Sequence, residues 1–297
     1  MSHNHPTPSG KNLGITIILN VVITVAQFIG GIISGSMALI SDATHNFSDV
    51  LSLIISYIAN RLSKKKATEE QTFGLRRSEI MAAFFNSTTL IFLSVFILYE
   101  AIGRLMKPPQ EIAAEWVIYL ALLSIAANGL SVLLIKNDAK GNINMRSAYL
   151  HLFSDMLTSI AVLAGGLAMK YFQWYWVDSV FSIAIAIYLL YMSWDIFKTS
   201  IRILMQYTPK SIDVKKIIAE LEKVDGVSNL HHVHIWQIND HEIMFESHVD
   251  MEEDIHISDF EKILDQMNAV LKQNHILHAT LQPEYGVNDS KDVIHNH

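Results

Sequence analysis

Residues 41–49 read Ser-Asp-Ala-Thr-His-Asn-Phe-Ser-Asp, and residues 151–155 read His-Leu-Phe-Ser-Asp. Each stretch holds a histidine and an aspartate four residues apart, which gives two pairs: His45 with Asp49, and His151 with Asp155. In a helix, residues four apart lie on one face, so each pair presents an imidazole and a carboxylate together. Both pairs lie inside long apolar segments, where ionisable groups are costly and usually functional.

The surrounding composition is that of a membrane protein. Of the 297 residues, 51% are hydrophobic and only 17% are charged, whereas soluble domains carry about 25% charged residues. Six segments approach or exceed the roughly 20 apolar residues needed to cross a bilayer: 13–33, 37–60, 78–103, 114–135, 145–169 and 175–200. From Thr208 the composition is that of a soluble domain. We therefore predict an α-helical membrane protein, with six transmembrane helices over residues 1–207 and a cytoplasmic domain over residues 208–297.

Basic residues in the loops predict the orientation of these spans. One side holds twelve: Lys11, Arg61, Lys64, Lys65, Lys66, Arg76, Arg77, Lys136, Lys140, Arg146, Lys198 and Arg202. The other side holds three: Arg104, Lys107 and Lys170. The excess places both termini in the cytoplasm. The first segment has spanning length and no small-residue cleavage pattern, so we expect an uncleaved span and a bacterial inner membrane.

The two His–Asp pairs are expected to meet. At about 1.5 Å per helical residue, both lie near the midplane of a hydrocarbon core about 30 Å thick. Two imidazoles and two carboxylates form a four-ligand set that suits tetrahedral Zn²⁺. The alternative is that each pair is a polar clamp between helices, without metal. Other polar residues of the spans are interpreted as helix–helix contacts: Asn20, Gln27, Asn86, Asn128 and Asp178.

Several classes of function are excluded. There are no cysteines, which rules out disulfides, thiolate zinc sites, iron–sulfur clusters and cysteine nucleophiles. The net charge of −7 and the lack of a binding motif argue against nucleic acid. No phosphate-binding loop is present, so the chain alone is no ATP-driven pump.

Residues 208–297 are predicted to form a helix, two strands, a helix and a strand, in that order. Ser211 or Asp213 begins a helix through Val224, Ser258 precedes a second, and strands are expected over 230–238, 243–250 and 278–281. This αββαβ order is typical of a small metallochaperone-like α/β sandwich. Simple alternation along the first strand places His232 and His234 on one face. The opposite face would then carry His231 with Val233 and Ile235.

The chain resembles the cation diffusion facilitator family of zinc transporters. The matching residues are Ser41–Asp49, Arg77-Ser78-Glu79-Ile80, Tyr99-Glu100-Ala101-Ile102, the pair His151 and Asp155, and Val177-Asp178-Ser179. The resemblance implies a homodimer that exports divalent cations from the cytoplasm in exchange for protons. Its zinc-preferring branch also handles cadmium or cobalt in some members. The chemistry agrees, because an imidazole must be neutral to bind metal, so metal arrival releases protons.

The resemblance also implies a regulatory cytoplasmic site, with ligands His231, His248 and Glu284 and with Gln282 or His232 alongside. The alternative is that these are solvated surface histidines. A histidine-based site between the second and third spans is not expected, because residues 61–77 contain no histidine. An intersubunit lysine–aspartate lock is doubtful, because no acid lies near Leu204–Gln206.

The sequence is compatible with three functions. A secondary active transporter, with Zn²⁺ as the transported ion and no enzyme chemistry or organic cofactor, accounts for the four ligands. A membrane-anchored metal sensor would not need ligands at the midplane. A zinc hydrolase keeps one coordination position open for water, whereas four protein ligands fill it. Transport is therefore the predicted function.

Overall fold

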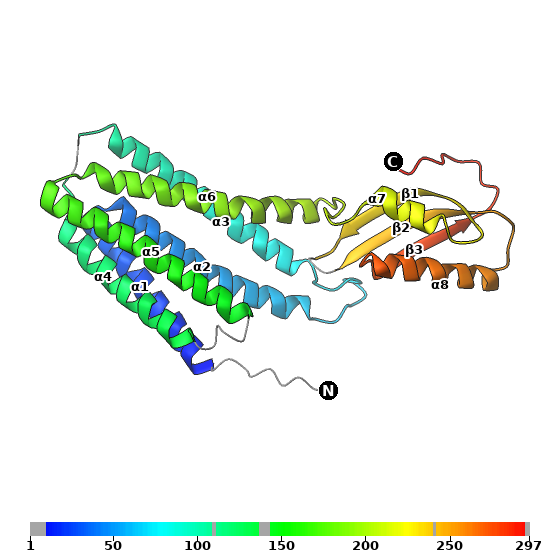
Figure 1. Ribbon diagram of the computed structural model, residues 1–297, viewed down its shortest axis with the longest axis horizontal. Coiled ribbons are helices and arrows are strands. Elements are labelled where there is room, and N and C mark those ends of the chain that lie inside the picture. Colours follow the sequence, from blue (N-terminus) through cyan, green and yellow to red (C-terminus); the bar gives the residue numbers. More distant parts are fainter. Residues whose placement is uncertain (1–9, 109–110, 137–142, 240–241, 295–297) are drawn as a thin grey trace. The chain divides into compact units, whose positions relative to one another are not determined.

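The computed structural model describes residues 10–108, 111–136, 143–239 and 242–294 (Figure 1). Within its helices, the side chains of residues 10–17, 52, 53, 56, 57, 60, 135 and 143–151 lie outside this description. Contacts divide the chain into two units. The first contains Met1–Tyr57 and Phe85–Phe197, and the second contains Ile58–Phe84 and Lys198–His297.

Six long helices follow the apolar segments of the sequence. They are α1 (Gly10–Ser34), α2 (Met37–Ser63), α3 (Ser78–Leu105), α4 (Ala114–Ile135), α5 (Ile143–Phe172) and α6 (Trp176–Leu204). In the part of the chain that the structure describes, four helical segments have the length and hydropathy of a membrane span: Ser78–Leu105, Ala114–Leu134, Leu152–Phe172 and Trp176–Leu204.

The expectation of six spans is thus confirmed for four helices. In α1 the apolar stretch among described residues is Ile18–Ser34, which is shorter than the other four. Helix α2 is not among the four segments found in the described residues, and it carries Asp42, His45 and Asp49. These helices make up a transmembrane domain.

Helices α1 and α2 form a tight hairpin. Gly35 turns the chain with φ of 74°, a left-handed conformation that glycine adopts without steric cost. A Cβ atom on Gly31 would lie 2.6 Å from Cγ1 and 3.1 Å from the backbone nitrogen of Ile40, so only glycine permits this approach of the two helices. The Asp178 carboxylate then caps α2, because the Ser36 hydroxyl and the Met37 N–H donate to it.

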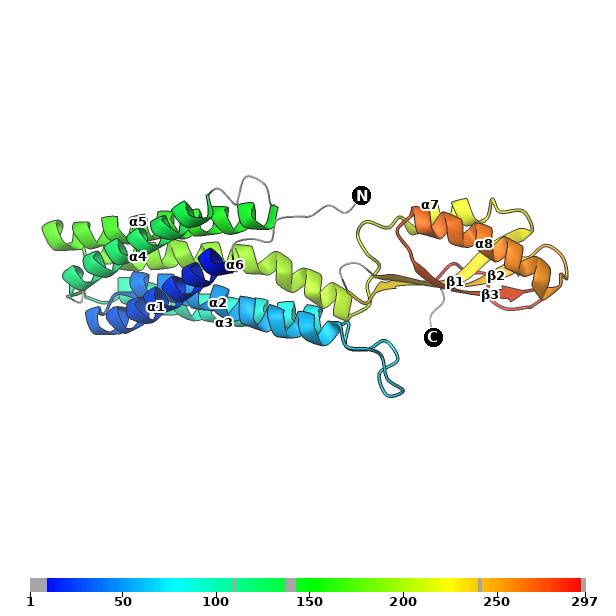
Figure 2. The ribbon, with the colours of Figure 1, turned by 90° about the horizontal axis from the view of Figure 1, so that it is seen from below.

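The second unit carries a three-stranded sheet. Its elements are α7 (Val214–Leu221), β1 (Val227–Gln237), β2 (Ile243–Met251), α8 (Ile257–Gln273) and β3 (His278–Glu284). The strand order is β1-β2-β3, with β1 antiparallel and β3 parallel to β2. Figure 2 shows α7 and α8 on one face of this sheet. The αββαβ order is confirmed, although α8 begins at Ile257 and so includes Ser258, which was expected to precede it.

A β-bulge in β1 changes which side chains share a face. The register shifts between His231 and His234, and His232 has φ of 56°. Leu230 and Val233 therefore both enter the hydrophobic core under α7 and α8, while His231 pairs with His248 on the other face. The predicted grouping of His231 with Val233 and Ile235 is wrong, because the bulge adds a residue and shifts the alternation.

Candidate metal centres

One candidate centre lies between α2 and α5 in the first unit. Nε2 of His45 is 3.4 Å from Oδ1 of Asp155, and Nδ1 of the same ring is 3.6 Å from Oδ2 of Asp49. One ligand atom from each of the three residues lies within 4.8 Å of the others. The side chains of His45 and Asp155 are 12% and 1% exposed. The structure therefore brings together three of the four residues that the two motifs predict.

The fourth predicted ligand is His151. It lies on α5 one turn before Asp155, but its side chain is outside the described residues. The edge of the His45 ring meets Tyr188 of α6, with ring centroids 6.4 Å apart.

Asp42 is a buried carboxylate beside this centre that the sequence did not assign to it. It is 1% exposed and accepts hydrogen bonds from Nε2 of Gln27, at 2.6 Å, and from Oγ1 of Thr158, at 3.2 Å. Asn46 in turn donates to Gln27, which confirms the helix–helix role predicted for Gln27. Asp42 thus joins α1, α2 and α5. Asp42 lies three residues before His45, so helical spacing already places it near that ring, whereas only the fold shows that its partners come from α1 and α5.

The chemistry of this centre admits either a metal ion or a proton. Ligand atoms around tetrahedral Zn²⁺ are separated by about 3.3–3.5 Å, and the distance between His45 and Asp155 falls in this range. An imidazole with protons on both nitrogens would instead donate toward both carboxylates. The same three residues can therefore bind a metal ion with a neutral ring, or hold a proton in its absence.

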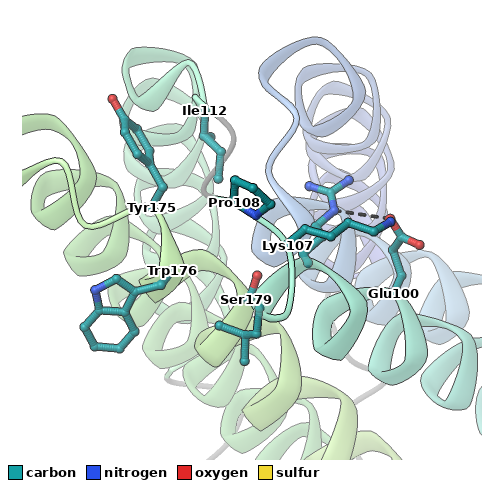
Figure 3. Close-up of a pocket in the computed structure, with 9 residues that line it drawn as sticks. Glu100, Lys107, Pro108, Ile112, Tyr175, Trp176 and Ser179 are labelled. Carbon is teal, nitrogen blue, oxygen red and sulfur yellow. Dashed lines mark hydrogen bonds and ion pairs between the residues drawn. The ribbon is translucent and has the colours of Figure 1, made fainter.

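Two other family motifs have structural roles. Figure 3 shows a pocket between the end of α3 and the start of α6, lined by Glu100 and Ser179 among others. Arg104 forms an ion pair with Glu100, 3.3 Å from Nε to Oε1, and donates to the carbonyl oxygen of Gly35. These contacts fasten α3 to the turn before α2. Together with the Asp178 cap, they fix the helix that carries His45.

A second candidate centre lies on the sheet face opposite α7 and α8. Nε2 of His231 is 3.4 Å from Oε2 of Glu284, and Nδ1 of His248 is 2.8 Å from Oε1 of Glu284. His231 and Glu284 are 1% and 8% exposed. Nδ1 of His248 and Oε2 of Glu284 form no hydrogen bond despite these distances. Buried polar atoms are normally satisfied, so their convergence fits a site for a cation.

The remaining predicted ligands lie at the edge of this second centre. Gln282 pairs with His248 in the sheet register and donates to Oε1 of Glu284 at 3.0 Å. The ring of His232 lies 4.7 Å from that of His248, centroid to centroid. His232 does not belong to the group of imidazoles and carboxylates that converge within 4.8 Å.

That group contains one residue that sequence reasoning missed. Oδ2 of Asp289 lies 3.2 Å from Nε2 of His231, and Lys291 holds the other carboxylate oxygen at 2.6 Å. The hydrogen bond from Lys291 lowers the pKa of Asp289 below its ordinary value. Burial opposes the charge of Lys291, but hydrogen bonds to Asp250 and Asp289 outweigh this and raise its pKa. Asp289 follows β3 in an irregular segment, so no periodicity points to it.

Comparison with known proteins agrees with both halves of this structure. Residues 13–205 match the cation efflux transmembrane domain, and residues 209–285 match the cytoplasmic domain of cation efflux proteins. The chain belongs to the cation efflux family, the cation diffusion facilitators. The resemblance inferred from the motifs is therefore confirmed.

Relatives extend over nearly the whole chain. A cadmium, cobalt and zinc/H(+)-K(+) antiporter of Bacillus velezensis is 37% identical, over 99% of this chain and 95% of its own. The metal cation efflux system protein CzcD of Cupriavidus metallidurans is 31% identical, over 98% and 92%. The zinc transporter ZitB of Pectobacterium atrosepticum is 34% identical, over 96% and 89%. This family member is thus a multi-pass membrane protein of a transport family.

Proposed function

We propose that this cation efflux protein is a secondary active transporter that exports divalent metal ions from the cytoplasm in exchange for protons. The observation that carries the proposal is the position of His45 between Asp49 of its own helix and Asp155 of α5. Zn²⁺ is the proposed substrate, with Cd²⁺ and Co²⁺ as further ones, because all three accept imidazole and carboxylate ligands. The names of the relatives, which include zinc, cadmium, cobalt and H(+), support this choice.

In this mechanism metal and protons compete for the same groups. A cytoplasmic metal ion binds His45, Asp49, His151 and Asp155 once the imidazoles are neutral, and their protons leave. Opening to the other side exposes the site to protons, which displace the metal and reload the imidazoles. The carboxylates on both sides of His45 would hold the protonated ring on the return step.

The proposal includes an arrangement in the membrane. We place six spans in a bacterial inner membrane, residues 1–207 forming the transmembrane domain and residues 208–297 a cytoplasmic domain, with both termini cytoplasmic. The uneven distribution of Lys and Arg supports this orientation. The match to the family's cytoplasmic domain supports the placement of the sheet, and we propose a homodimer as the assembly.

The second centre is proposed as a regulatory metal site with His231, His248 and Glu284 as ligands and with Gln282 or His232 alongside. Its convergent buried atoms also favour a second candidate function, a membrane-anchored sensor whose cytoplasmic domain reports metal load. The two functions differ in whether metal crosses the membrane.

Zinc uptake into proteoliposomes under an imposed pH gradient tests the proposal. We expect gradient-dependent flux in the unmodified protein, and flux at the level of protein-free liposomes in Asp49→Ala and in Asp155→Ala. Asp225→Ala, at an exposed position after α7, removes the same charge and should transport normally. Equal flux in all variants would mean that the His–Asp pairs are only polar clamps between helices. Absence of flux in the unmodified protein, with zinc still bound by the cytoplasmic domain, would favour the sensor instead.

A further inference from the structure

The segment after β3, residues 285–294, is called the tail. We infer that the tail is part of the cytoplasmic metal site, with Asp289 as a metal ligand, so that metal binding fastens the tail to the edge of the sheet. The inference rests on the proposed regulatory site and adds a ligand and a consequence to it. The matched family domain ends at residue 285, so Asp289 and Lys291 lie outside the shared domain.

The tail runs along β1, the first strand of the described sheet (Figure 1). The N–H groups of His232 and Val233 donate to the carbonyl oxygens of Asp292 and Val293, at 3.2 and 2.8 Å. These donors lie at the bulge of β1, where pairing with β2 is interrupted. The bulge therefore makes two backbone N–H groups of β1 available, and carbonyl oxygens of the tail accept their hydrogen bonds. Backbone groups at the edge of a sheet favour such pairing.

This path places Asp289 beside the ligand atoms. Its Oδ2 lies 3.2 Å from Nε2 of His231, and that nitrogen lies 3.4 Å from Oε2 of Glu284. The Glu284 side chain is only 8% exposed, and its Oε2 atom forms no hydrogen bond. With His248, the cluster offers two nitrogens and two carboxylates. This is a complete set of four for a tetrahedral divalent ion.

Lys291 and Asp250 orient these ligands. The Lys291 ammonium lies 2.8 Å from Oδ1 of Asp250 and 2.6 Å from Oδ1 of Asp289. The other oxygen of each carboxylate faces the His231 ring. Oδ2 of Asp250 lies beside Nδ1, and Oδ2 of Asp289 lies beside Nε2. A carboxylate at Nδ1 fixes the ring so that Nε2 can face a metal.

Charges balance once a divalent ion is bound. Asp250, Glu284 and Asp289 carry three negative charges, and Lys291 with a divalent ion supplies three positive ones. Without Asp289, the remaining charged groups and a bound divalent ion have an excess positive charge, and the ion has one ligand fewer. Lys291 therefore remains beside the bound metal as a positioning residue.

The test uses the full chain in detergent, with Asp49→Ala and Asp155→Ala introduced to remove the transmembrane site. Zn²⁺ alone is titrated in competition with a chromophoric chelator. Adding Asp289→Ala should weaken zinc binding at least about 10-fold, since even the loss of a partner that only orients a ligand costs about 10–100-fold. The matched control is Asp265→Ala, which removes the same charge from an exposed position on α8 and should bind zinc normally.

Hydrogen exchange of the tail amides gives a second readout. Zn²⁺ should slow exchange in the tail and at His232 and Val233. Lys291→Met should speed this exchange without metal, and Zn²⁺ should restore protection through Asp289. In Asp289→Ala, Zn²⁺ should have no such effect.

Two results would overturn the inference. Unchanged zinc affinity in Asp289→Ala, with tail exchange indifferent to metal in the parent chain, refutes the tail ligand and leaves the regulatory site standing. Failure of the parent chain to bind zinc at all would remove the regulatory site and the inference together, while leaving transmembrane transport to the flux experiment.

Discussion

At the level of single residues, the neighbours of a buried polar side chain distinguish a proposed metal ligand from a residue that only stabilises helix contacts. His45 and Asp42 lie within one turn of α2, and both are polar residues in an apolar setting. The His45 ring lies beside two carboxylates, whereas the Asp42 carboxylate accepts hydrogen bonds from Gln27 and Thr158. A carboxylate satisfied by neutral donors has little reason to bind a cation. Asp42 is therefore a support of the helix contacts around the centre.

Asp42→Asn tests that distinction. The substitution replaces a charged acceptor with a neutral amide, and a hydrogen bond to a charged group contributes about 1.5–3 kcal/mol, against about 0.5–1.5 kcal/mol for a neutral one. We expect a lower thermal unfolding midpoint in detergent, with zinc uptake that persists. Asp155→Ala should show the reverse, with uptake lost. Wild-type stability together with abolished uptake in Asp42→Asn would instead make Asp42 a member of the transport site.

At the level of elements, the α1–α2 hairpin and the β1 bulge each position a proposed ligand. Close packing at Gly31 and the Asp178 cap determine where α2 begins and hence where His45 lies. The bulge in β1 turns His231 away from the core and exposes the donors that the tail uses. In both elements a local backbone feature decides the position of a side chain that we propose as a metal ligand.

The hairpin can be tested with two glycines. Gly31→Ala adds a Cβ that must displace Ile40, including its backbone, and such overpacking costs about 1–3 kcal/mol. Gly103→Ala adds a Cβ with no atom within 4 Å, and helix propensity favours alanine by up to about 1 kcal/mol. Thermal unfolding should show a lower midpoint for Gly31→Ala only. Equal midpoints would mean that the hairpin tolerates a wider separation.

At the level of the whole molecule, the chain combines two units, each with its own cluster of imidazoles and carboxylates. One cluster lies among helices of membrane-spanning character, and the other lies on a small sheet. We propose that the first moves metal and the second responds to it. This division requires the sheet to face the cytoplasm, where metal accumulates before export.

The absence of cysteine from the chain allows a direct test of that orientation. Glu252→Cys marks the second unit, and Met106→Cys marks the exposed residue that follows α3, which is 84% exposed. A membrane-impermeant maleimide should label Met106→Cys in intact spheroplasts and Glu252→Cys only after lysis. The opposite pattern would invert the proposed topology and with it the direction of transport.

Much of this protein could be predicted from its sequence by itself. Hydrophobic segments locate the helices because burying apolar surface in lipid or in a core depends mainly on composition and period. The His-x-x-x-Asp spacing predicts His45 with Asp49 and His151 with Asp155 as ligands, because an α-helix places residues four apart on one face. The order αββαβ follows from period and turn residues in the same local way.

Only the tertiary structure decided the remaining contacts. The bulge at His231–His234 reverses the alternation, and Asp289 reaches His231 from an irregular segment 58 residues later in the chain. Asp178 caps a helix that begins 141 residues before it. These contacts have no period to detect, because they depend on how separate segments pack and on where an edge strand leaves its backbone groups unpaired.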